Sequence, residues 1–371
     1  MGVEKIIMNT KSNRNLNIEI LRIIAMFLII MGHSIGHTYL LESIPQNSIN
    51  YYLVSLLQII SYPATNIYVM ISGYLLCEKQ FKVKRIFTIW CQVFFYSIVL
   101  MLAVGIIDRG LFSIKSFIKV LMPISGNQYW FARVYIGLYL LMPFINKFIL
   151  SLNKKNYQAF LLVCFILFSL WRSFIPFAKT LNGEGGNSII WFVVLYCFGA
   201  YLKLYGFSEK LTIKKQLIYV SGLLLFSFSS RLAITWISNL IGLNGAGSSL
   251  FTEFTSFPML LTAWLIINFV VKSSKNLGGY SRYILWFSNS TFSVYLIHEN
   301  QYVKKFLWNF IDMPEKAESQ AIVLVIIVVT LGIFVICTIL DKILFVQASK
   351  FLKYIKFEKI QGVVESYLHK N

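Results

Sequence analysis

The sequence predicts an all-α, polytopic membrane protein with about ten transmembrane helices and with both termini inside the cell. Apolar runs of roughly 18 to 22 residues recur along the 371-residue chain, and each is long enough to cross a bilayer as a helix. Only 13% of the residues are charged, whereas a soluble domain carries roughly 25%. This composition argues against a soluble enzyme, a disordered chain and a disulfide-rich secreted scaffold.

The apolar runs follow one another with short connections. We therefore expect one integral-membrane domain over residues 1–341 and a basic cytosolic tail over residues 342–371. The first run passes into polar residues without a small-residue cleavage site, which favours a retained helix over a signal peptide. The predicted spans, in chain order, are residues 18–37, 52–76, 86–107, 129–149, 157–177, 188–205, 217–238, 254–271, 283–300 and 321–341.

The net charge of +19 arises from 34 Lys and Arg against 15 Asp and Glu. In a soluble protein this excess would suggest nucleic-acid binding, but here most of the basic residues lie between apolar runs. An N-terminus inside the cell places most of them in the cytosol, as the positive-inside rule requires. The basic segment 78–85 is then cytosolic and the loop 38–51 is external. We expect a multi-pass protein of a bacterial plasma membrane that contacts the lipid bilayer and binds no nucleic acid.

The five cysteines all lie in or beside apolar runs, and none shows CxxC or CxH spacing. This pattern favours small packing residues over a metal site or a disulfide framework, so no metal is expected. In the tail, Lys350, Lys353, Lys356 and Lys359 recur at three-residue steps with apolar residues between them. That spacing is typical of an amphipathic helix on anionic lipid.

The first predicted span carries a stripe of polar residues along one face. Arg22 and His33 are eleven residues apart, close to three full turns, so their side chains share a face about 16 Å apart along the axis. Glu19 lies one turn before Arg22, and His37 lies one turn after His33. Ionisable groups at membrane depth are costly and usually face a polar interior. The alternative is that Arg22 reaches the inner headgroups and that His33 is a satisfied buried histidine.

Four further segments follow the pair formed by Arg22, ten intervening residues and His33. They are NIYVMISGYLL (66–76), the basic segment ending in Lys82 and Arg85, QYWFARVYIGLYLLMPFIN (128–146) and STFSVYLIHE (290–299). In this order they resemble the Arg-x10-His signature and the later motifs of acyltransferase family 3. The resemblance covers about residues 14–340. Members of that family are integral membrane proteins that acylate sugars of surface polysaccharides.

The resemblance implies an acyl-CoA donor on the cytosolic side, most often acetyl-CoA, and a carbohydrate acceptor. Coenzyme A carries several phosphates, and the predicted topology gathers Arg22, Lys82 and Arg85 at the inner surface. Together with Ser72 of the Ser-Gly-Tyr motif, these residues are the expected donor-binding set. A pantetheine arm can span the about 16 Å from Arg22 to His33.

His33 is the expected general base, because a histidine titrates near neutral pH. A covalent acyl-histidine is the less favoured variant. His298 is the second expected catalytic residue, orienting the acceptor or relaying a proton, unless it is an interfacial histidine at a helix end. The expected acceptor-binding residues are His37, Trp130, Arg133, Tyr295 and Glu299, and Glu299 is also suited to fixing the tautomer of a neighbouring histidine.

The donor that stabilises the oxyanion stays open at this stage among Arg133, Arg231, Asn66, Ser72 and Trp130. For the two arginines, an ion pair or an interfacial anchor is an equal alternative, and Ser72 with Gly73 also suits close helix packing. A different class of function is a polysaccharide exporter or proton-coupled transporter, which would also place Arg and His at membrane depth. A third class of function is a non-catalytic assembly subunit. The sequence shows no inverted repeat, and its motifs follow the order of the acyltransferase family. Both observations favour the acyltransferase over the transporter.

Overall fold

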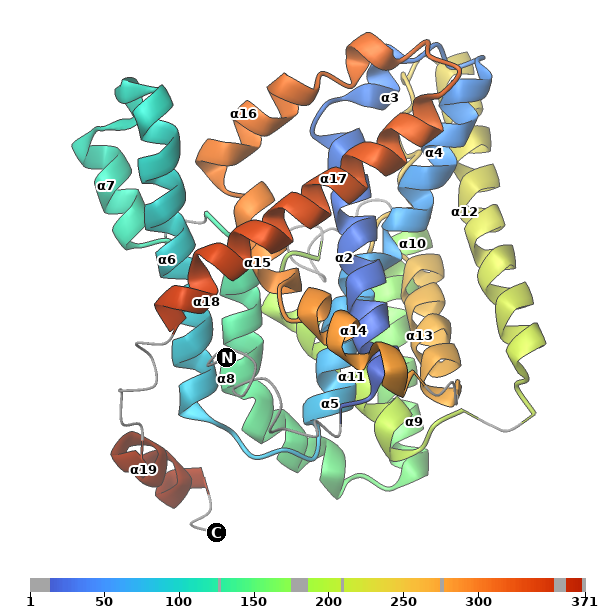
Figure 1. Ribbon diagram of the computed structural model, residues 1–371. Helices are drawn as coiled ribbons and strands as arrows, with labels where there is room; N and C mark the ends of the chain where they lie inside the picture. The colour runs from blue at the N-terminus through green and yellow to red at the C-terminus, as the bar shows by residue number, and fades with distance from the viewer. Residues whose placement is uncertain are drawn as a thin grey trace.

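The computed structural model describes residues 14–125, 128–174, 186–207, 210–273, 277–349 and 358–368. All regular elements in these ranges are helices and none is a β-strand, so the predicted all-α fold is confirmed. Figure 1 shows the helices gathered around α2 (Leu16–Gly36). The other helices are α3 (Leu40–Ser43), α4 (Ile49–Ser61), α5 (Pro63–Leu76), α6 (Val83–Ile107), α7 (Ile114–Leu121), α8 (Trp130–Ser151), α9 (Lys154–Phe165), α10 (Trp171–Phe174), α11 (Ile189–Leu204), α12 (Ile213–Leu240), α13 (Phe257–Lys272), α14 (Ser281–Ser288), α15 (Thr291–His298), α16 (Gln301–Ile311), α17 (Ile322–Ile343), α18 (Phe345–Ala348) and α19 (Glu358–Leu368).

The polytopic membrane architecture is also confirmed. Seven helical segments in the described ranges are long and apolar enough to cross a bilayer, and each matches a predicted span. Two further predicted spans, 188–205 and 254–271, correspond to α11 and α13, which are apolar but only 16 residues long. Helical segments of sufficient length therefore account for seven of the ten predicted spans. Large apolar side chains stay exposed along α8, α12 and α17, as a lipid-facing surface requires.

The remaining predicted span, 283–300, is not one helix. It divides into α14 and α15 at Asn289 and Ser290. The carboxylate of Asp341, which is only 3% exposed, accepts hydrogen bonds from the hydroxyls of Ser290 (2.6 Å), Ser293 (2.5 Å) and Tyr96 (2.8 Å). A buried carboxylate needs such donors, so this contact ties the start of α15 to α6 and α17.

The predicted span 52–76 is also interrupted, because Pro63 begins a new helix after Tyr62. Proline favours the first turn of a helix, where its missing N–H costs nothing. The resulting α5 crosses α11 at very short range. A Cβ atom added to Gly73 would strike the carbonyl of Tyr196, and one added to Gly199 would strike the carbonyl of Met70. This crossing supports the alternative that the Ser-Gly motif serves close packing at Gly73.

Helix α2 lies at the centre of the molecule and packs against α4, α5, α13, α14, α15 and α17. It begins where the side chain of Asn15 accepts a hydrogen bond from the N–H of Asn17 (3.0 Å), a normal N-cap. Because apolar neighbours surround it, polar side chains on its inner face contact protein rather than lipid. The five cysteines are free thiols.

The predicted tail, residues 342–371, contains the end of α17, then α18 and α19. Helix α19 contacts the loop between α5 and α6, where Gln361 bonds to the backbone of Phe81 and Val83 (both 2.8 Å). This contact lies at the end of the molecule where α2 begins (Figure 1). Lys350, Lys353 and Lys356, on which the predicted amphipathic helix depends, lie outside the described residues.

Candidate active site

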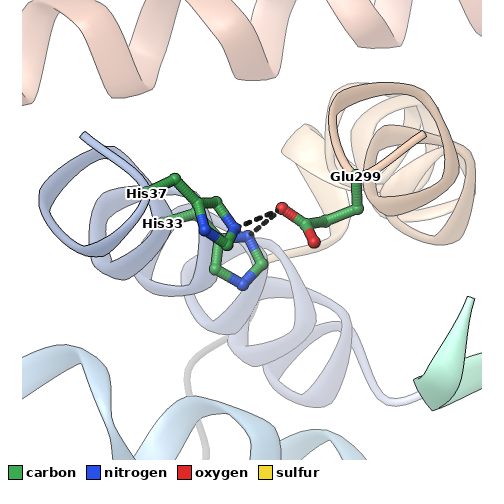
Figure 2. A group of neighbouring side chains, drawn as sticks. All are labelled: His33, His37 and Glu299. Atoms are coloured by element: carbon green, nitrogen blue, oxygen red, sulfur yellow. Dashed lines mark hydrogen bonds and ion pairs between the residues drawn. The ribbon is translucent and has the colours of Figure 1, made fainter. Parts of the chain in front are cut away.

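Four predicted site residues meet between the end of α2 and the end of α15. The Nδ1 atom of His33 lies 3.1 Å from Nε2 of His298 and 3.2 Å from Oε1 of Glu299. The Nε2 atom of His37 lies 2.7 Å from the same carboxylate oxygen. Figure 2 shows the two imidazoles of α2 directed at the carboxylate of Glu299. We call these four residues the histidine cluster.

The hydrogen bonds within the histidine cluster assign its protons. The Nδ1 atom of His298 lies 2.6 Å from the carbonyl oxygen of Val294, and a carbonyl only accepts, so Nδ1 of the neutral ring carries the hydrogen. Its Nε2 atom is then an acceptor that faces His33. His33 therefore donates its Nδ1 hydrogen toward His298 and Glu299, and its own Nε2 atom keeps a lone pair. Among the described residues, no group forms a hydrogen bond to that Nε2 atom.

Glu299 occupies the turn between α15 and α16, and its side chain is only 9% exposed. Besides the two histidines, it accepts a hydrogen bond from Nζ of Lys304 (3.2 Å). The turn is fixed by Asn300, which caps α16 through the N–H of Tyr302 (3.0 Å) and donates to the hydroxyl of Tyr129 (2.6 Å). The carboxylate is therefore held in place by its neighbours on both sides.

Two imidazoles and one carboxylate form a donor set suited to zinc, and His33, His37 and Glu299 offer ligand atoms within 4.8 Å of one another. Zn–N bonds of about 2.0–2.1 Å would hold neighbouring ligand atoms about 3.3 Å apart in a tetrahedral site. The 2.7 Å between His37 and Glu299 is instead a hydrogen-bond length. The arrangement therefore fits a proton-bearing cluster better than a metal centre.

A narrow apolar pocket adjoins His33. The free space in it is about 30 Å³. Two of the predicted acceptor-binding residues, Trp130 and Tyr295, lie in its wall, so the structure brings them together with the expected base. The pocket is lined by Met26, Ile29, His33, Thr65, Tyr68, Trp130, Phe131, Phe292 and Tyr295.

A second, polar pocket of about 300 Å³ lies where α8, α11 and α16 begin. This volume falls within the range of small-molecule sites, roughly 300–1,000 Å³. Trp130 lines both pockets, and Glu299 joins the polar pocket to the histidine cluster. The polar pocket is lined by Gln128, Trp130, Arg133, Asn187, Glu299, Gln301 and Lys304.

Three of the four predicted donor-binding residues, Ser72, Lys82 and Arg85, gather elsewhere, near the loop between α5 and α6. The hydroxyl of Tyr135 lies 3.1 Å from both Oγ of Ser72 and Nη2 of Arg85. The guanidinium of Arg85 also lies 5.2 Å from the ring centre of Tyr139, whose hydroxyl accepts from the N–H of Lys82 (3.2 Å). We call these five residues the basic site.

Cys77 lies beside the basic site, at the end of α5. Burial raises the pKa of its thiol to about 11. The thiol therefore stays protonated at neutral pH and is not poised as a nucleophile.

Arg22 lies on α2 about three turns from His33 and forms an ion pair with Glu19 (3.3 Å). Among the described residues, Arg22 and the basic site line neither of the two pockets. Aromatic side chains connect the apolar pocket to the basic site. Tyr68 and Phe131 both line the pocket with ring centres 6.0 Å apart, and the ring of Phe131 stacks on that of Tyr135 (5.9 Å).

The structure also narrows the possible oxyanion donors. Asn66 donates to the carbonyl of Phe254 (2.5 Å) and accepts from the indole of Trp191 (3.3 Å), so its amide is already engaged. Arg231 bonds to the side chain of Gln58 (2.6 Å) on α4. Of the five candidates, Trp130 alone lines the apolar pocket beside His33.

Several residues of the site were not predicted from the sequence. Four line the polar pocket: Gln128, Asn187, Gln301 and Lys304. The others are Tyr68 of the apolar pocket, Tyr129 beside Asn300, Tyr135 and Tyr139 of the basic site, and Asp341. Only Asp341 gives a signal of its own, as a lone carboxylate at the end of a long apolar run. The others are ordinary polar residues at helix ends or tyrosines in an aromatic-rich chain.

A comparison with protein families agrees with this geometry. A family model described as an acyltransferase domain matches residues 15–342, nearly the whole chain. Neither the curated proteins nor the solved structures include a significant match. The match begins before the polar stripe of α2 and ends at Lys342, so it includes the histidine cluster, both pockets and the basic site. This integral membrane protein therefore belongs to acyltransferase family 3.

Proposed function

We propose that the protein transfers an acetyl group from acetyl-CoA to a sugar hydroxyl of a cell-surface or lipid-linked polysaccharide, with His33 as the general base. Family membership supports acyl transfer in general. The observation that carries the finer proposal is the free lone pair on Nε2 of His33, which lines the apolar pocket next to a polar pocket of carbohydrate size.

The donor is proposed to enter from the cytosol, with the N-terminus and the tail, residues 342–371, on that side of a bacterial plasma membrane. Arg22 and the basic site would hold the phosphates of coenzyme A. The pantetheine arm would pass Tyr68, and the thioester would reach the apolar pocket at His33. A cationic entrance and an apolar interior suit the two ends of this donor.

The reaction follows from the proton assignment. The acceptor hydroxyl loses its proton to Nε2 of His33 as its oxygen attacks the thioester carbonyl. The tetrahedral oxyanion collapses, the C–S bond breaks, and the coenzyme A thiolate takes the proton back from the imidazolium. The free coenzyme A leaves as a thiol and the acceptor keeps an ester.

The positive charge that His33 gains during the reaction lies 3.2 Å from Glu299. A fixed carboxylate at that distance stabilises the imidazolium and fixes the ring orientation. His298 holds the Nδ1 hydrogen of His33 in place, which keeps Nε2 available as the base. His298 is thus proposed as a positioning residue.

The small volume of the apolar pocket favours a short acyl group. The free space beside His33 is narrow and has aromatic walls, so a long acyl chain would have to displace more side chains than an acetyl group. Trp130, in the wall shared by both pockets, is the proposed oxyanion donor through its indole N–H.

The test uses the purified full chain, radiolabelled acetyl-CoA and a polysaccharide acceptor. His33→Ala should lower transfer by about 10²- to 10⁴-fold, the usual contribution of a general base, without changing protein yield. Arg22→Ala should raise the KM for acetyl-CoA. Normal transfer by both variants would contradict the assignment. If wild type consumes no acyl-CoA but moves a glycan across vesicles, the exporter hypothesis holds instead.

A further inference from the structure

The polar pocket contains polar groups that the described protein does not satisfy. The side-chain atoms Nε2 of Gln128, Oδ1 of Asn187 and Nε2 of Gln301 are buried and form no hydrogen bond among the described residues. Gln128 is held in place, since its Oε1 atom accepts from the hydroxyl of Ser97 (2.7 Å). Buried polar groups are nearly always paired, so three unpaired ones around a single pocket indicate a ligand with both donors and acceptors. Sugar hydroxyls supply both.

The charges of the polar pocket do not balance. Lys304 pairs with Glu299, at 3.2 Å between Nζ and Oε2. Arg133, on α8, is half-buried, and its guanidinium forms no ion pair or hydrogen bond within the ranges that the structure describes. A half-buried guanidinium that lines a polar pocket normally faces an anion or another acceptor. The ligand that completes this pocket therefore supplies a negative charge.

We propose that the acceptor carries an oxyanion, a carboxylate or a phosphodiester, close to the hydroxyl that is acylated, and that Arg133 binds it. This inference rests on the proposed function, since it names the class of acceptor for the same site. Glu299 bounds the pocket on the side of the histidine cluster, and Trp130 bounds it on the side of the apolar pocket. An acidic sugar held by Arg133 would present a neighbouring hydroxyl to His33.

The first experiment compares matched acceptors with the purified full chain and acetyl-CoA. One acceptor is an oligosaccharide containing uronic acid, the second is the same oligosaccharide with its carboxyls reduced to alcohols, and the third carries glycerol phosphate groups. Wild type should show a KM at least tenfold lower for one of the acidic acceptors than for the neutral one. Preference for the first or the third acceptor distinguishes a carboxylate from a phosphodiester.

The variant Arg133→Gln should abolish that preference, whereas Arg133→Lys should keep part of it. Arg231→Gln is the matched control, because Arg231 is also an arginine on a membrane helix but bonds to Gln58 instead. The control should retain the preference of wild type. Equal KM values of wild type for acidic and neutral acceptors, or an unchanged preference in Arg133→Gln, would overturn the proposal.

A binding measurement separates this proposal from the proposed function. Trp130 lines the polar pocket, so glucuronate, the phosphodiester glycerophosphoglycerol and glucose can be titrated while tryptophan fluorescence is recorded, with Trp130→Phe identifying the responding side chain. Wild type should respond to at least one of the two anions at concentrations at least tenfold below those needed for glucose, and Arg133→Gln should not. If this holds but no glycan is acylated, the enzymatic proposal fails and the anion site stands. Equal responses to glucose and both anions would overturn the anion site.

Discussion

The Nδ1 atom of His33 lies 3.1 Å from the Nε2 atom of His298, although 265 positions separate the two residues in the chain. The contact joins the first membrane helix to the short helix α15 near the other end of the sequence. Since the carbonyl of Val294 fixes the proton on Nδ1 of His298, the tautomer of His33 depends on α15, a helix far from α2 in the chain.

Substituting His298 tests this dependence. In His298→Phe the side chain stays an aromatic ring, but one of the two acceptors for the Nδ1 hydrogen of His33 is lost and only Glu299 remains, so the wrong tautomer of His33 becomes more accessible. We expect kcat to fall about 10- to 100-fold, less than in His33→Ala, with little change in KM for acetyl-CoA. The pH profile of kcat should also shift, which a merely structural defect would not produce. An unchanged kcat and pH profile would show that His298 does not position the base.

Glu299→Gln removes the charge that faces the imidazolium and leaves Lys304 without its partner. We expect a large loss of kcat and a destabilisation of about 1–2 kcal/mol, since Lys304 is partly exposed. The double variant Glu299→Gln with Lys304→Met should recover the thermal stability in detergent but not the activity. Recovery of both would mean that Glu299 serves only as a structural ion-pair partner.

Asp341→Asn should weaken the attachment of α15 to α6 and α17. The amide places hydrogen-bond donors where hydroxyl donors already point, so we expect a loss of about 1–3 kcal/mol. Thermal unfolding in detergent measures it, and acyl transfer should fall because α15 carries His298. Asp312→Asn is the matched control at an exposed position and should change stability by less than about 0.5 kcal/mol. Equal stability of the two variants would contradict the tethering role.

Chelation tests whether the histidine cluster works without a metal. Prolonged treatment with EDTA, followed by assay in metal-free buffer, should leave acyl transfer unchanged. Added Zn²⁺ should inhibit, because His33 and His37 are one helical turn apart and would turn toward the ion together with Glu299. Loss of activity on chelation that zinc restores would identify a metal centre instead.

Gly73→Ala and Gly199→Ala test the crossing of α5 and α11. Each new methyl group meets the backbone of the opposite helix, which cannot move aside as a side chain can. We expect each variant to lose about 1–3 kcal/mol of stability. Gly332→Ala, in the open surface of α17, is the control and should be neutral or slightly stabilising. A thermal scan of the three proteins in detergent checks the difference.

Most of the long helices were predictable from the sequence, because a segment that crosses a bilayer must be apolar over about 20 residues. The period of the helix is likewise sufficient to place His33 and His37 on one face. The break between α14 and α15 at Asn289 and Ser290 was not predictable in this way. Hydropathy is averaged over a window of about 19 residues, which hides a turn of only two residues.

The candidate site was predictable only in part. The resemblance named His298 and Glu299, but their contact with His33 depends on the position of α15, whose start is tied to α17 by hydrogen bonds to Asp341. Gln128 and Asn187 carry no pattern of their own, because their role arises only when the starts of α8 and α11 come together.

The reciprocal glycine contact between α5 and α11 has a consequence for how the enzyme can change its substrate range. The separation of the two helices is set by main-chain atoms, which are the same whatever the neighbouring side chains are. Tyr68 on α5 projects into the apolar pocket from this fixed frame. On the proposed function, smaller side chains at positions such as Phe292 should widen the pocket for a larger acyl group while the spacing of α5 and α11 stays unchanged.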